Sequence, residues 1–179
     1  MKTKILLFFT TLLFLTGCQS NDNLDISITN ADLVGSWNLT SQTIEKGEMS
    51  ITSSGSTVTM TYSAEAKNLD MMYTFSENPN ELKLQGSYNF TTTVSLLGQT
   101  EVEEQLIDTS INPIDATSWV LNSNNTITIT ESTNSLPMIL TIEDFSTNYI
   151  KLKGVIDESE SDNGDSISIK ATIYMTLEK

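Results

Sequence analysis

The feature that most constrains this chain is a long alternation of apolar and polar side chains from Glu81 to Leu97. Successive side chains of a β-strand point to opposite faces, so a period of two predicts a strand with one buried and one wet face. The inward positions of this strand are Leu82, Leu84, Gly86, Tyr88, Phe90, Thr92, Val94 and Leu96. The segment from Ser166 to Glu178 repeats the pattern and predicts a second long strand.

Shorter stretches with the same alternation fill the rest of the chain and bring the expected total to about eight to ten strands. They lie around residues 58–62, 71–75, 102–106, 119–121, 127–129, 140–142 and 150–156. Turn-forming residues separate them, at Lys46-Gly47, Asn78-Pro79-Asn80, Gly98-Gln99, Asn124-Asn125, Ser135-Leu136-Pro137, Thr147-Asn148 and residues 162–165. No connection is long enough for a helical crossover, so sequential strands should pair antiparallel in an all-β meander.

The length of the strand that begins at Glu81 favours a barrel over a sandwich. At roughly 3.3 Å per residue this strand would run about 55 Å, which is too long to lie straight in a domain of this size. The strand must bend, and a glycine such as Gly86 on the inner face allows a bend most easily. We therefore predict an antiparallel up-and-down β-barrel, with a β-sandwich as the alternative.

The N-terminal segment predicts export. Lys2 and Lys4 precede an apolar run from Ile5 to Leu15, which is well short of the roughly twenty residues needed to cross a bilayer. The run ends in Leu15-Thr16-Gly17-Cys18, which resembles the bacterial lipobox. This resemblance implies that residues 1–17 are a lipoprotein signal peptide and that Cys18, the single cysteine, becomes the acylated first residue.

Lipid on Cys18 should hold the protein at a membrane surface without spanning it. Gln19, and not Asp, follows Cys18. By resemblance to the sorting rules of bacterial lipoproteins, the absence of Asp there favours the outer membrane, so we expect that location, facing the periplasm or the cell surface. Residues 18–31 are polar and predict a flexible tether, which leaves residues 32–179 as one domain.

Composition excludes several function classes. The chain has a net charge of −14, and removal of Lys2 and Lys4 leaves seven lysines against 23 acidic residues, or −16. A domain so acidic repels phosphate backbones, so nucleic acid is not an expected partner. The chain has no histidine and no cysteine besides Cys18, so we expect neither enzymatic activity nor a cofactor.

Two acidic stretches are candidate sites, but we expect both to be solvated surface. Glu101, Glu103 and Glu104 lie on a predicted strand but point to both of its faces. The run from Asp157 to Asp165 does not fit an EF-hand loop, because placing Gly164 sixth puts Lys170 at the twelfth position, where a glutamate is required. We therefore predict no metal site.

The first strand carries a family resemblance. Gly35-Ser36-Trp37 resembles the Gly-x-Trp signature of the lipocalins, in which the tryptophan plugs the closed end of the barrel. Together with the lipobox and tether, it is similar to the lipocalin-like lipoproteins of Bacteroidetes. Lipocalins usually pack a last-strand arginine over this tryptophan, whereas this chain has no arginine and its nearest candidate, Lys170, has the outward parity.

The resemblance implies a binding module for a small apolar ligand inside the barrel. The inner aromatic residues that could line such a site are Tyr62, Tyr73, Phe75, Tyr88 and Phe90. The same residues could instead fill the core completely. In that alternative the protein is a structural or interaction lipoprotein whose acidic loops bind a protein or a glycan, and the sequence leaves both functions open.

Overall fold

The computed structural model describes residues 27–111, 117–131, 137–162 and 164–179. The predicted signal peptide, Cys18 and most of the predicted tether lie outside this range. Within it, one short helix precedes nine strands: α1 (Asn30–Leu33), β1 (Gly35–Ser53), β2 (Ser56–Ser76), β3 (Glu81–Leu96), β4 (Gln99–Asp108), β5 (Thr117–Leu121), β6 (Thr126–Glu131), β7 (Met138–Phe145), β8 (Tyr149–Asp162) and β9 (Asp165–Glu178). No helix in these residues is long and apolar enough to cross a membrane.

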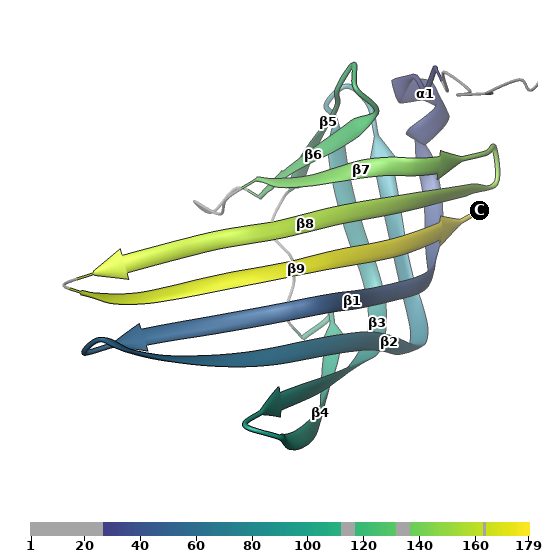
Figure 1. Ribbon diagram of the computed structural model, residues 1–179. Helices are drawn as coiled ribbons and strands as arrows, with labels where there is room; N and C mark the ends of the chain where they lie inside the picture. Colours follow the sequence, from purple (N-terminus) through teal and green to yellow (C-terminus); the bar gives the residue numbers. More distant parts are fainter. Residues whose placement is uncertain (1–26, 112–116, 132–136, 163) are drawn as a thin grey trace, which may run out of the picture.

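The strands form a single antiparallel sheet that closes into a ring (Figure 1). The order is β2-β1-β9-β8-β7-β6-β5-β3-β4, and pairing of β2 with β3 closes the ring. Strand β4 is not part of the ring and pairs only with β3. The predicted all-β meander barrel is confirmed, and the chain does not form the alternative β-sandwich.

Strand β3 changes its neighbour near Gly86. Before this point Glu81 and Leu82 pair with β5, and residues 87–96 pair with β4 instead. Gly86 has a φ of +120°, and the backbone N–H of Thr109 donates a hydrogen bond of 3.1 Å to its carbonyl oxygen. A register shift in β2 between Lys67 and Asp70 lies opposite. Gly86, where the sequence predicts a bend, therefore lies where the strand leaves one partner and takes the next.

The structure corrects one predicted turn. Lys46-Gly47 does not end a strand but forms a bulge inside β1, where Lys46 has a φ of +53° and the pairing with β9 skips from Glu45 to Glu48. The chain reverses later, at Ser54 and Gly55. An extra residue in a strand and a tight turn both interrupt the alternation, which is why the sequence did not distinguish them.

The described residues of the predicted tether contact the barrel. Residues 27–31 were assigned to the tether, but Ile28 packs against the core and α1 begins at Asn30. The largest fully buried side chains gather in the part of the ring next to α1, and they are Leu33, Trp37, Phe75, Trp119, Ile127, Leu140, Ile150 and Leu177. The short strands β5, β6 and β7 span only this part, whereas β8, β9, β1 and β2 run on beyond it (Figure 1).

Candidate ligand site in the barrel interior

Trp37 lies at the α1 end of the ring and is fully buried. Its indole N–H donates a hydrogen bond of 2.7 Å to the carbonyl oxygen of Leu33, the last residue of α1. The first turn is capped by Asp32, whose carboxylate accepts a 2.9 Å bond from the Thr29 backbone N–H. Its hydrogen bonds with Thr29 also lower the pKa of Asp32. The tryptophan is therefore bound to the helix at the end of the barrel where β1 begins.

A lysine packs over the Trp37 ring. The Nζ atom of Lys179 lies 4.2 Å from the ring centroid, a cation–π contact. Lys170, the nearest candidate in the sequence, instead points outward and forms a 3.7 Å ion pair with Asp157. Lys179 was missed because it follows the last strand, although it shares the inward parity of the buried Leu177.

The second tryptophan, Trp119, lies where β3 meets β5. This joint of the ring has fewer ladder pairs than any other between its described strands. Within the described residues β3 pairs with β5 only through Glu81 with Ser118 and Leu82 with Thr117. Trp119 is fully buried, and its indole N–H donates a 3.0 Å hydrogen bond to the carbonyl oxygen of Ser76. Its ring packs edge-on against Phe75 at 5.4 Å. These contacts supplement the two ladder pairs.

A cavity of about 200 Å³ lies inside the ring. Its apolar lining consists of Leu82, Leu84, Ile129, Met138, Leu140, Ile173 and Met175. Its polar lining consists of Gln42, Tyr73, Tyr88, Thr117 and Glu131. Met138 and Glu131 are solvent-exposed, so the cavity opens on the side of β6 and β7. Several strands on opposite sides of the ring contribute to it, which makes it the interior space of the barrel.

The polar groups of the cavity can hold a ligand by hydrogen bonds. Burial raises the pKa of Tyr73 and of Tyr88, so both phenols stay protonated at neutral pH. A side-chain hydrogen bond with Gln42 opposes this rise in the pKa of Tyr88. The buried Oε1 atom of Gln42 has no hydrogen-bond partner among the described residues. It is therefore an acceptor available to a ligand.

The five aromatic residues predicted to line a site do not all lie at the cavity. Tyr73 and Tyr88 line the cavity. Phe75 lies deeper, against Trp119, and Phe90 packs edge-on against Tyr88 at 6.0 Å without lining the cavity. Tyr62 lies farther along β2, where it pairs with Gly47 and borders a separate shallow groove. Gln42 belongs to the cavity but was not predicted.

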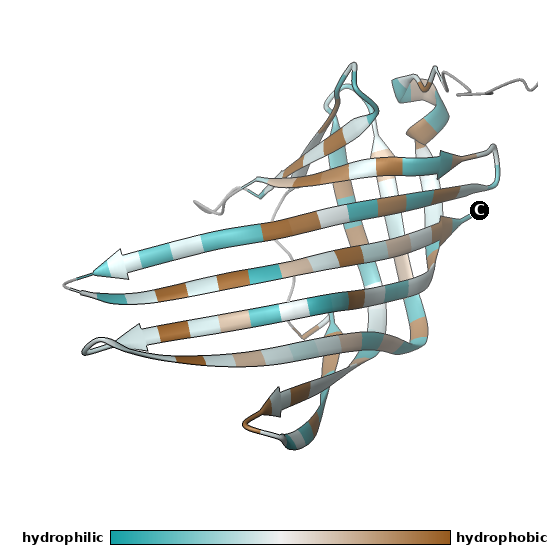
Figure 2. Cartoon of the chain, viewed as in Figure 1, coloured by the Kyte–Doolittle hydropathy of each residue, from teal (hydrophilic) through white to brown (hydrophobic). Residues whose placement is uncertain are grey.

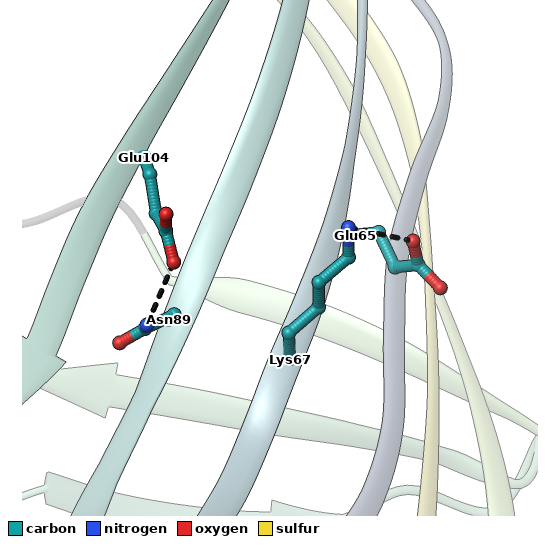
Figure 3. Close-up of polar contacts among 4 residues, drawn as sticks. All are labelled: Glu65, Lys67, Asn89 and Glu104. Carbon is teal, nitrogen blue, oxygen red and sulfur yellow. Dashed lines mark hydrogen bonds and ion pairs between the residues drawn. The ribbon is translucent and has the colours of Figure 1, made fainter.

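The acidic stretches do not assemble a second site. Glu104 points outward, and its carboxylate accepts a 2.7 Å hydrogen bond from Asn89 of β3, beside the pair formed by Lys67 and Glu65 at 3.8 Å (Figure 3). Glu101 and Glu103 alternate with Glu104 along β4 and therefore lie on its other face. In the described part of the chain no group of three or more acidic, histidine or cysteine side chains is arranged to hold a metal ion.

Comparisons with protein-family models, with curated proteins and with solved structures found no match to this chain. An inference about a ligand therefore rests on the size, lining and hydrogen-bonding groups of the cavity itself.

Proposed function

We propose that this protein is an exported, lipid-anchored binding protein that takes a small apolar ligand into the interior of its barrel. The cavity is the observation that carries the proposal, because it is an interior space that a small ligand can occupy. Its volume of about 200 Å³ is below the range of drug-sized pockets. An engineered apolar cavity of about 150 Å³ binds benzene, so a molecule with one ring matches the space available here.

The lining also specifies one polar group on the ligand. A buried acceptor without a partner costs roughly 1–3 kcal/mol, and a ligand donor placed against Gln42 Oε1 would recover that free energy. The rest of the wall is mainly aliphatic, with the two phenols of Tyr73 and Tyr88 on one side. The ligand class that fits is a single-ring or similarly compact apolar molecule carrying one O–H or N–H group.

This class predicts different affinities for two probes of nearly equal shape. p-Cresol should bind the protein about 2- to 10-fold more tightly than toluene, because only p-cresol carries a hydroxyl that can donate to Gln42. Saturation-transfer NMR detects binding of each probe, and calorimetric titration gives the two dissociation constants.

Two variants make this experiment specific to the cavity. Gln42→Leu removes the acceptor and should bring p-cresol down to the affinity of toluene, while Leu84→Phe should fill the space and remove binding of both probes. Thermal unfolding of both variants checks that the fold is kept. Absence of binding of either probe to the unmodified protein would contradict the proposal and favour the filled-barrel alternative.

The proposal includes a lipid anchor at the outer membrane, supported by the lipobox-like Leu15-Thr16-Gly17-Cys18. The lipocalin resemblance is part of it as well. Its support is the buried Trp37 after Gly35, the cation packed over the indole ring, and the ring of strands around a cavity.

The proposed lipid attachment at Cys18 can be tested independently of the cavity. Cys18→Ala should leave the precursor unprocessed by the lipoprotein signal peptidase and free of acyl chains, because the thiol is the only group at that position that can be acylated. Labelling of cells with radioactive palmitate, followed by immunoprecipitation, measures this directly. Incorporation of palmitate into the variant at the level of the unmodified protein would show that Cys18 is not the attachment site.

A further inference from the structure

Strands β8, β9, β1 and β2 continue past the closed part of the barrel as an extension of the same sheet (Figure 1). We define the sheet extension as residues 155–162 of β8, 165–170 of β9, 48–53 of β1 and 56–61 of β2. Strand β7 pairs with β8 only as far as Gly154, so within the described residues no strand flanks the β8 side of the extension. Its inner face continues the face that lines the barrel, because Ile167 and Ile169 keep the parity of the buried Ala171 and Ile173.

The inner face of the sheet extension is apolar across three strands. One row across the sheet runs from Ile167 to Ile51 to Val58, and the next runs from Ile169 to Met49 to Met60. The first row is 46%, 38% and 45% exposed, respectively. The second row is half-buried. These residues lie in register on neighbouring strands, so they form one continuous surface and not scattered apolar side chains.

The outer face of the same strands is polar. Ser50 and Thr59 share a hydrogen bond of 2.8 Å across β1 and β2, and Thr52 and Thr57 share another of 2.8 Å. Figure 2 shows the alternation as brown and pale bands along the free halves of β9, β1 and β2, beside a mostly hydrophilic end of β8. An apolar face exposed on one side only is a surface suited to a partner.

Carboxylates border this apolar face. Glu160 pairs with Ile167 and Glu158 pairs with Ile169, so each row begins with a glutamate on β8. A neighbouring row runs from Tyr62 to Val94 and ends at Glu101 on β4, so a carboxylate also lies on the opposite side. All three glutamates are exposed. None of the residues in these rows is basic, and the apolar face therefore lies in a negative field.

We propose that the inner face of the sheet extension docks a segment of a partner protein that has an apolar centre flanked by lysine or arginine. The apolar rows would bury the centre of such a segment, and the glutamates at both borders would select its positive ends. A second copy of this chain would bring the same carboxylates against one another. An anionic lipid surface is repelled for the same reason.

The test uses two synthetic peptides with the same alternating valine and threonine centre, one with lysines at both ends and one with glutamates. Fluorescence anisotropy of the labelled peptides, titrated with the protein, should show at least about tenfold tighter binding of the lysine-flanked peptide. This preference should shrink as salt is raised, because the border carboxylates are exposed and screened. Equal affinity for the two peptides would overturn the proposal.

Variants separate the border from the apolar face. Glu158→Gln with Glu160→Gln should weaken binding of the lysine-flanked peptide about three- to tenfold. The matched control, Glu45→Gln with Glu48→Gln, changes the net charge equally on the outer face and should leave binding unchanged. Ile51→Thr with Ile167→Thr should weaken binding about tenfold or more while keeping the strands, because both side chains are exposed. An equal effect of the outer-face control, or no effect of the isoleucine variant, would overturn the assignment of this face.

Discussion

Replacing Trp37 with alanine is expected to lower the free energy of unfolding by about 3–5 kcal/mol, the range for deleting a large buried aromatic side chain. The indole ring is fully buried, its N–H is satisfied by the Leu33 carbonyl oxygen at 2.7 Å, and Lys179 covers its face. Alanine would lose this packing and leave the Leu33 carbonyl without its donor. Urea unfolding of the two proteins measures the difference.

Two further variants show how the loss of stability divides among the apolar packing, the hydrogen bond and the cation–π contact of Trp37. Trp37→Phe keeps most of the apolar contact but removes the hydrogen bond, so it should retain a large part of the stability. Lys179→Gln removes only the cation and should cost about 0.5–1 kcal/mol, since the lysine is exposed.

Fluorescence gives an independent check of the same residue. In a Trp119→Phe background the remaining emission should be blue-shifted and poorly quenched by iodide, as expected for a buried indole. A readily quenched Trp37 whose removal costs less than about 1 kcal/mol would instead mark a surface strand, and it would remove the main residue-level support for the lipocalin resemblance.

Gly86→Ala is expected to destabilise the protein by about 3 kcal/mol or more. A Cβ atom at Gly86 would lie 1.8 Å from the carbonyl oxygen of Asp70 and 3.1 Å from the Cα atom of Met71. These are backbone atoms, so the two strands would have to separate at the bend. The φ of +120° adds strain for any residue with a side chain.

Gly98→Ala is the matched control for this prediction. Gly98 also has a positive φ, of +82°, but a Cβ atom there would meet nothing within 4 Å. It should cost only the backbone strain of about 1–2 kcal/mol. Thermal unfolding compares the two variants, and equal losses of stability would mean that the close approach of β3 to β2 at Gly86 is not a constraint.

The alternation of side chains was sufficient to predict the architecture. A period of two fixes which side chains of a strand share a face, and the excessive length of the strand from Glu81 required a bend. The alternation did not predict the length of each strand. Residues 58–62 and 71–75 were expected in separate short strands, but they belong to one strand, β2. The irregular residues between them form a bulge and not a turn.

The candidate site was only partly predictable, because parity identifies the face of a side chain but not its height along the barrel. Tyr62 and Tyr73 differ in parity along the sequence, and the register shift between Lys67 and Asp70 turns both toward the inner face of β2, yet only Tyr73 lies where the short strands complete the ring. Gln42 was missed for another reason. A register shift between Leu39 and Ser41 changes the parity of β1, so that Gln42 faces the cavity although the alternation from Trp37 and Leu39 would turn it outward.

The two-pair joint between β3 and β5 has a consequence for the kinetics of binding. Strands β5, β6 and β7 supply one wall of the cavity, through Thr117, Ile129 and Leu140 among others. Separation of these short strands at the joint opens the cavity sideways at a lower free energy than global unfolding, since few ladder bonds are broken. For the ligand proposed above, this local opening would add a second route into the cavity besides the mouth beside β6 and β7. A change that tightens the joint would slow association and release by this route together and leave the equilibrium affinity unchanged.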